Sequence, residues 1–162
     1  MSAAAGPVTD SDTILRVLRS TKTVAIVGSS PNSSRASYFV AMYLRADAPE
    51  FTVWFVNPKE RQILGQPAYA CLGDLPGVPD LVDVFRRTED LPGVAYEAVA
   101  AGAKSLWFQL GLVHHQAALT AEAAGLAVVQ DRCLKIEHAR YHGGLHKAGF
   151  DTGVITSRRR DA

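Results

Sequence analysis

The chain has 162 residues, 48% of them hydrophobic, and its 17 basic and 16 acidic residues give a formal net charge of +1. A chain of this length can bury roughly 70% of its unfolded surface in one core, so we expect a single domain over residues 1–162. The balanced charge argues against nucleic acid or an anionic membrane surface as a partner. The longest stretch without formal charge, residues 105–121, is interrupted by glutamines and histidines, which argues against a membrane span.

Two cysteines, Cys71 and Cys133, lack the spacing of a metal-binding CxxC motif. The amino-terminal residues lack the continuous apolar segment of a secretory leader. Unpaired cysteines suit a reducing compartment better than an oxidising one. We therefore expect a cytoplasmic location.

The first predicted elements are a short helix and a strand–helix unit. Asp10 or Ser11 can cap a helix that runs to about Arg19. Residues 23–27 are apolar or β-branched, as in a buried parallel strand, and residues 38–44 have the periodicity of a helix. This unit begins an α/β pattern.

The middle of the chain predicts two further strands with an irregular segment between them. Residues 51–56 form a strand that ends at Asn57-Pro58, where proline blocks a central ladder. Residues 59–73 contain only short apolar pieces, so we expect little regular structure there. Residues 81–85 predict the third strand.

Strands and helices alternate in the remainder of the chain. Helices are expected at residues 88–101, 116–124 and 133–141, and strands at residues 105–110 and 126–129. This alternation is typical of βαβ crossovers. We predict an α/β, three-layer Rossmann-like domain with a mainly parallel five-stranded sheet and helices on both faces, a core over about residues 21–141 and a carboxyl-terminal extension at residues 142–162.

The strand at residues 23–27 ends in Gly28-Ser29-Ser30-Pro31, which is typical of a phosphate-binding turn. A strand, a tight turn and a helix N-terminus direct free backbone N–H groups and the positive end of a helix dipole at one point. Anions bind at such points. The sequence therefore predicts a ligand that carries phosphate.

The turn keeps only the first glycine of the dinucleotide-binding motif GxGxxG. Ser30 and Ser33 occupy the other two glycine positions, so the backbone cannot approach a pyrophosphate in the same way. The second strand ends in Asn57, where dinucleotide-binding domains commonly have an acidic residue for the ribose. Lys59 follows, and a cation there favours a ligand with additional phosphate.

Six separated motifs resemble small stand-alone CoA-binding domain proteins of bacteria, whose Rossmann-like fold is similar to the CoA-binding domain of the succinyl-CoA synthetase alpha subunit. The motifs are VGSSP at residues 27–31, SRASY at 34–38, VNPK at 56–59, VDVFRR at 82–87, WFQLG at 107–111 and DRCLKIEH at 131–138. The resemblance covers about residues 21–141. It implies that the ligand is CoA or an acyl-CoA.

The resemblance also implies which residues bind the ligand. The phosphate end would be bound by Gly28, Ser29, Ser30 and Pro31 of the turn, by Arg35 and Ser37 at the start of the next helix, and by Lys59 after Asn57 and Pro58. Phe85 and Arg86 would border the groove, and the pantetheine arm would lie along Gln109, Leu110 and Gly111. All these positions follow the carboxyl ends of strands, where open parallel sheets bind ligands.

Cys133 has two interpretations. A cysteine at a helix N-terminus can be reactive, because the positive end of the dipole favours the thiolate, and near the pantetheine end it could form a mixed disulfide with CoA. The simpler interpretation, which we favour, is a small buried residue that closes the sheet.

No nucleophile with an adjacent base is visible in the sequence, so we predict ligand binding without catalysis. Asp83 and Asp131 could form an acid–base pair, but strand-end aspartates more often cap turns or pair with arginines. The synthetase relatives use a histidine on a further domain and a partner subunit. Two alternatives stay open: an NAD(P)-binding oxidoreductase or redox sensor, and a component of an acyl-CoA ligase. A homodimer or a partner protein is also left open.

Three histidines recur at every fourth residue near the carboxyl terminus. On one continuous helix His138, His142 and His146 would lie on one face, as metal ligands can. Gly143 and Gly144 interrupt that helix. We therefore predict no metal site.

Overall fold

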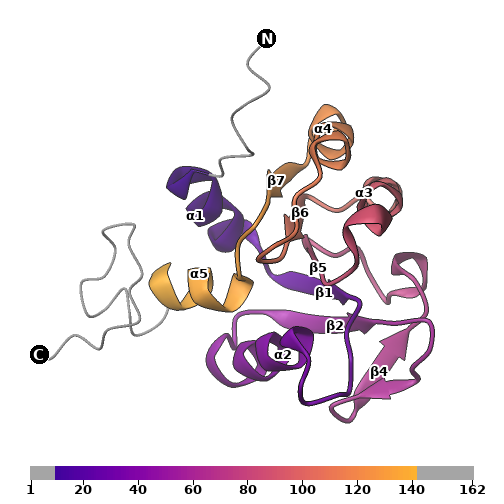
Figure 1. The fold of residues 1–162 in the computed structure, drawn as a ribbon. Helices are drawn as coiled ribbons and strands as arrows, with labels where there is room; N and C mark the ends of the chain where they lie inside the picture. Colours follow the sequence, from indigo (N-terminus) through magenta and orange to yellow (C-terminus); the bar gives the residue numbers. More distant parts are fainter. Residues whose placement is uncertain (1–9, 142–162) are drawn as a thin grey trace, which may run out of the picture.

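A computed structural model describes residues 10–141 as an open seven-stranded sheet with helices on both faces (Figure 1). The strands lie in the order β3-β4-β2-β1-β5-β6-β7, and all neighbours are parallel except β3 and β4. Their bounds are β1 Thr23–Val27, β2 Thr52–Val56, β3 Gln62–Ile63, β4 Gln66–Tyr69, β5 Leu81–Val84, β6 Ser105–Phe108 and β7 Ala127–Val129. The three-layer Rossmann-like fold is confirmed, and the extension predicted at residues 142–162 lies outside the described residues.

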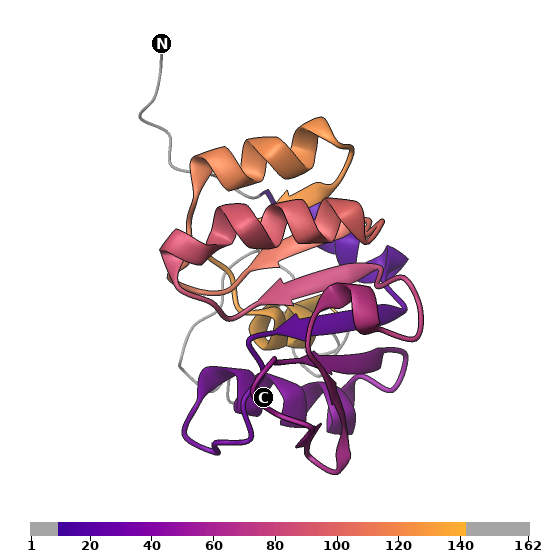
Figure 2. The same cartoon turned by 90° about the vertical axis from the view of Figure 1, so that its right-hand side faces the viewer.

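The sheet separates the helices into two layers. Their bounds are α1 Ser11–Ser20, α2 Ala36–Asp47, α3 Leu91–Ala100, α4 His115–Ala123 and α5 Leu134–Tyr141, with short 3-10 turns at Leu72–Asp74 and Thr88–Asp90. Helices α1, α2 and α5 cover one face, with α5 against both others, while α3 and α4 lie side by side on the opposite face (Figure 2). No helix within residues 10–141 is long and apolar enough to cross a bilayer.

The central strands are buried because both of their faces are covered. Successive residues of a strand point to opposite faces, so Val24 and Ile26 pack under α1, α2 and α5, while Ala25 and Val27 pack under α3 and α4. The fully buried Trp107 of β6 lies in the first layer, and its Nε1 donates a hydrogen bond to the carbonyl of Arg132 at 2.8 Å. This bond fixes the chain between β7 and α5.

The prediction of five strands was wrong, because residues 59–73 contain the additional hairpin β3–β4. Its two-residue loop, Leu64 and Gly65, has positive φ angles of 50° and 74°. Two consecutive left-handed residues are typical of a type I′ hairpin turn, which usually has Asn or Asp before the glycine. Because this turn has leucine at that position, no signal for a hairpin is visible in the sequence. The hairpin joins the sheet through β4, which pairs in parallel with β2.

The order of the sheet reverses at β1. The chain passes from β1 to β2 on one side and then crosses to β5 on the other side. In open parallel sheets, the connections leaving strands at such a point diverge and leave a crevice at the carboxyl ends. A binding site is expected at this edge, between β1 and β5.

Candidate functional site

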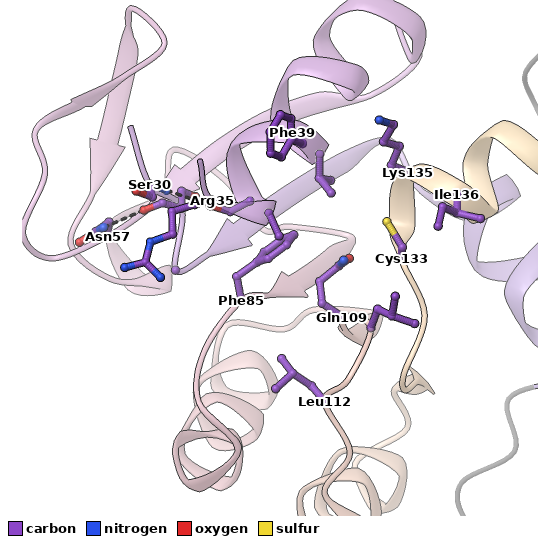
Figure 3. A pocket seen from close by; sticks show the side chains of 16 residues that line it. Ser30, Arg35, Phe39, Asn57, Phe85, Gln109, Leu112, Cys133, Lys135 and Ile136 are labelled. Carbon is purple, nitrogen blue, oxygen red and sulfur yellow. Dashed lines mark hydrogen bonds between the residues drawn. The ribbon is translucent and has the colours of Figure 1, made fainter. Parts of the chain in front are cut away.

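A cavity of about 820 Å³ opens at the carboxyl ends of the strands, beside the switch point. Such a volume is in the range of small-molecule and cofactor sites. Figure 3 shows Ser30, Arg35 and Asn57 at one end, Cys133, Lys135 and Ile136 at the other, and Phe85 and Gln109 between them. The cavity therefore has a polar end, a middle with an aromatic ring and an end that carries a thiol.

The polar end is built around Gly28, which has a φ of +83°. Its backbone N–H donates to the carbonyl of Val56 at 3.0 Å, and a Cβ at this position would lie 2.1 Å from the carbonyl oxygen of Phe85. Only glycine fits, because the conformation is left-handed and the backbone of the β5 end is in contact. The turn after β1 is thus held between the ends of β2 and β5.

The serines of the turn are held by internal hydrogen bonds. The backbone N–H of Ser29 donates to the carbonyl of Val56 at 3.3 Å, and that of Ser30 donates to Ser37 Oγ at 3.1 Å. Asn57 Nδ2 donates to the carbonyl of Ser29 at 2.7 Å (Figure 3). The first N–H groups after Gly28, which the sequence analysis expected to be free for phosphate, are therefore already in use.

The free donors lie instead at the N-terminus of α2. Within the described residues, no hydrogen bond engages the backbone N–H groups of Ala36 and Ser37, and no side chain caps the helix at Arg35. Both residues and Arg35 line the cavity. A helix N-terminus with unsatisfied N–H groups and an adjacent guanidinium is a suitable site for a phosphate.

The opposite end combines the residues that follow β6 with the start of α5. Gln109, only 6% exposed, accepts a hydrogen bond at Oε1 from the backbone N–H of Leu134 at 3.1 Å. Leu110 and Cys133 also line this part of the cavity. One glutamine side chain therefore links the end of β6 to the first residue of α5.

Ten of the candidate site residues named from the sequence line this one cavity: Gly28, Ser29, Ser30, Arg35, Ser37, Asn57, Phe85, Gln109, Leu110 and Cys133. Five others do not: Pro31, Pro58, Lys59, Arg86 and Gly111. Arg86 forms an ion pair with Asp90 at 3.4 Å, and the N–H of Gly111 donates to Asp131 Oδ1 at 2.7 Å. Lys59 is exposed, and its backbone N–H donates to Asn57 Oδ1 at 2.8 Å.

Sequence reasoning missed five of the helical residues that line the cavity. Ala36, Phe39 and Val40 line the cavity from α2, and Lys135 and Ile136 line it from α5. The spacing in α2 is a signal that could have been used, because positions i, i+3 and i+4 share one face of a helix. No comparable signal identifies Lys135 and Ile136, because their position depends on how α5 packs.

The acidic residues considered for catalysis do not line the cavity. Asp83 is fully buried within β5, and neither of its carboxyl oxygens has a hydrogen-bond partner within the described residues. Burial raises the pKa of Asp83 well above its ordinary value. The expectation that Asp83 caps a turn or pairs with an arginine was therefore wrong. Asp131, with a φ of 56°, accepts from Gly111 instead.

Of the three histidines spaced by four, His142 and His146 lie outside the described residues. His138 is 1% exposed, with Nδ1 2.9 Å from Tyr43 Oη and Nε2 2.9 Å from Glu50 Oε2. These two contacts join α5 to Tyr43 of α2 and to Glu50 in the segment between α2 and β2. Within residues 10–141, no group of three or more histidine, cysteine or acidic side chains is arranged to hold a metal ion.

The fold and the cavity define a Rossmann-like domain with a cavity at its switch point. The chain belongs to the CoA binding domain family, whose model matches residues 22–139. Protein YneT of Bacillus subtilis is 36% identical over 126 residues, which are 78% of this chain and 92% of YneT. The resemblance found in the sequence is thereby confirmed.

Solved structures and a larger enzyme extend this comparison. A hypothetical protein from Pyrococcus horikoshii is 33% identical with a TM-score of 0.76, over 86% of this chain and 98% of that chain. A Thermus thermophilus protein, also 33% identical, has a TM-score of 0.74 over 82% and 98% of the two chains. The ADP-forming acetate–CoA ligase I of Archaeoglobus fulgidus is 28% identical over 123 residues, or 70% of this chain and 18% of the ligase.

Proposed function

We propose that this protein binds coenzyme A or an acyl-CoA in the cavity at the switch point, and that it acts by binding and not by catalysis. The observation that carries the proposal is the order of chemical groups along one cavity: the free N–H groups and guanidinium at one end, an apolar middle, and a polar end with a thiol. CoA has the same order, with phosphates, a neutral pantetheine arm and a thiol.

At the phosphate end, Arg35 and the first N–H groups of α2 supply the positive field. A guanidinium can donate two hydrogen bonds to one phosphate, and the helix dipole adds to its attraction. A hydrogen bond from the backbone N–H of Ser30 to Ser37 Oγ holds the turn against the helix at this point. The phosphate is therefore expected at the start of α2, beside the turn after Gly28.

Along the middle, the neutral arm would contact apolar side chains. Phe39 is 55% exposed on α2, an unusual position for a large aromatic residue, and it faces the cavity together with Phe85 and Leu112 (Figure 3). Burying these rings against a methylene-rich arm removes apolar surface from water. This gives a physical reason for the exposed phenylalanine.

The lining also supports binding over acid–base catalysis. Among the described residues that line the cavity, the ionisable side chains are those of Arg35, Cys133 and Lys135, without a carboxylate or a histidine. General acid–base catalysis near neutral pH usually relies on those two side-chain types. The similarity to the acetate–CoA ligase supports CoA as the ligand. If the protein instead acts beside a partner subunit, a test of binding partners would detect that subunit.

Calorimetric titration with CoA, acetyl-CoA and NAD(P)(H) tests the proposal. We expect saturable binding of CoA and none of the dinucleotides. Arg35→Ala should weaken CoA binding about tenfold to hundredfold, because a hydrogen bond to a charged group contributes about 1.5–3 kcal/mol. Lys22→Ala is the matched control, because Lys22 is exposed immediately before β1, at the opposite end of that strand from the cavity.

Lys59→Ala distinguishes the role that the family resemblance implies for Lys59 from the position of its side chain in this structure. The resemblance implies that Lys59 meets a phosphate, whereas the side chain does not line the cavity. We expect an effect smaller than that of Arg35→Ala. Binding of a dinucleotide without any CoA signal would contradict the proposed function and favour a redox role.

A further inference from the structure

The thiol-bearing end of the cavity contains a largely buried glutamine, Gln109, whose amide donor faces the cavity. Gln109 is 6% exposed, and its Oε1 is fixed by the N–H donor of Leu134, which requires an oxygen at that position. Its Nε2 group consequently points away from α5. Within the described residues, no hydrogen bond engages Nε2, and the side chain points into the cavity (Figure 3). This amide donor is therefore available to an acceptor on a ligand in the cavity.

Cys133 lies at the same end, and its backbone is fixed on both sides. The carbonyl of Arg132 accepts from the buried indole of Trp107, and the N–H of Leu134 donates to Gln109. The carbonyl of Cys133 itself accepts from the backbone N–H of Glu137 at 3.0 Å, so Cys133 is the residue immediately before α5. Its side chain is partly exposed, unpaired with another cysteine, and directed into the cavity (Figure 3). A small residue that merely closes the sheet would not be open to the ligand space.

We propose that Cys133 undergoes thiol–disulfide exchange with a disulfide of CoA, so that the protein holds one CoA covalently; this inference rests on the proposed CoA binding. Phosphates at the start of α2 and the pantetheine amides at Gln109 would direct the sulfur of the bound molecule to Cys133. The sulfur of the bound CoA would then lie next to Cys133 Sγ.

The step balances without a further oxidant. The thiol of Cys133 releases its proton, and the thiolate attacks one sulfur of the CoA disulfide. The bond between the two CoA sulfurs breaks, a bond between Cys133 Sγ and one CoA sulfur forms, and the second CoA leaves as a thiolate that takes up a proton. The CoA disulfide is the oxidant, and an added thiol reverses the reaction.

The test is to incubate the full chain with CoA disulfide and to measure its intact mass without reductant. We expect one adduct, heavier than the free protein by one CoA less two hydrogen atoms and removed by dithiothreitol. Cys133→Ser should abolish it, whereas Cys71→Ser should retain it; Cys71 is exposed and outside the cavity, so it controls for general thiol reactivity.

A rate comparison shows whether the cavity directs the reaction. Cys133 should react at least tenfold faster with CoA disulfide than with hydroxyethyl disulfide, and Arg35→Ala should slow only the reaction with CoA disulfide. Equal labelling of both cysteines, or equal rates with both disulfides, would overturn the inference.

Calorimetry with reduced CoA separates this inference from the proposed function. If Cys133→Ser and the unchanged protein both bind reduced CoA but no adduct forms on Cys133, the inference is wrong and the proposed function stands. If reduced CoA does not bind and no adduct forms, both are wrong.

Discussion

Replacing Gly28 by alanine tests whether the turn after β1 has the geometry described above. The backbone of Gly28 is left-handed, with a φ of +83°. A Cβ would lie 2.1 Å from the carbonyl oxygen and 2.9 Å from the carbonyl carbon of Phe85. Both neighbours of the turn are fixed, because Gly28 donates to Val56 and the N–H of Phe85 donates to Val27. Rotation of a side chain cannot relieve a contact with backbone atoms.

Two contributions add to the expected loss of stability. A left-handed alanine costs roughly 1–2 kcal/mol, and forcing an extra carbon into a packed site costs about 1–3 kcal/mol more. Gly65→Ala is the matched control, because Gly65 has a φ of +74° but no atom within 4 Å of the position of a Cβ. Gly65→Ala should therefore lose only the first contribution.

Urea unfolding at neutral pH measures both free energies, and calorimetry with CoA measures the effect on binding. Gly28→Ala should be less stable than Gly65→Ala by about 1–3 kcal/mol, and only Gly28→Ala should weaken CoA binding. Equal losses of stability in the two variants would refute the steric account of the turn. Normal CoA binding by a folded Gly28→Ala protein would refute the role of the turn in the site.

Two further predictions concern buried polar residues that do not line the cavity, Asp83 and His138. Burial raises the pKa of Asp83 above its ordinary value of 3.8. Between these two pKa values the folded state therefore keeps a proton that the unfolded state releases. From about pH 4 up to the folded pKa, the free energy of unfolding should fall by at most about 1.4 kcal/mol per pH unit. Asp83→Asn should remove this fall, which urea unfolding at pH 5 and pH 7 would measure, and an unchanged pH dependence would contradict the assignment. His138→Ala should destabilise by about 2 kcal/mol or more, because it empties a buried site and leaves polar partners without the imidazole. The control is His115→Ala, which replaces an exposed side chain and should change the free energy of unfolding by no more than about 0.5 kcal/mol. Similar thermal unfolding of the two variants would show that the buried contacts of His138 contribute little.

The hairpin and the first helix show where local sequence signals succeed and where they fail. The sequence predicts Asp10 or Ser11 as a cap, because a short polar side chain before an apolar helical pattern satisfies a free N–H; Asp10 is the residue that does so, at Thr13. Leu64 gave no such signal. Its left-handed conformation is intrinsically unfavourable for leucine, and it is tolerated here with the side chain packed partly against the core. Packing overrode local preference, so β3 and β4 were not predicted.

The sequence by itself determined the alternation of strands and helices, the buried central strands and the position of the cavity beside Gly28. These follow from local periodicity and from the rule that parallel strands bring their carboxyl ends to one edge. Only the tertiary structure decided which donors stay free, because Ser37 uses the N–H of Ser30, and which helical residues complete the cavity. Lys135 reaches the site because α5 folds back over α2. Such contacts join residues distant in the chain, and no local pattern specifies them.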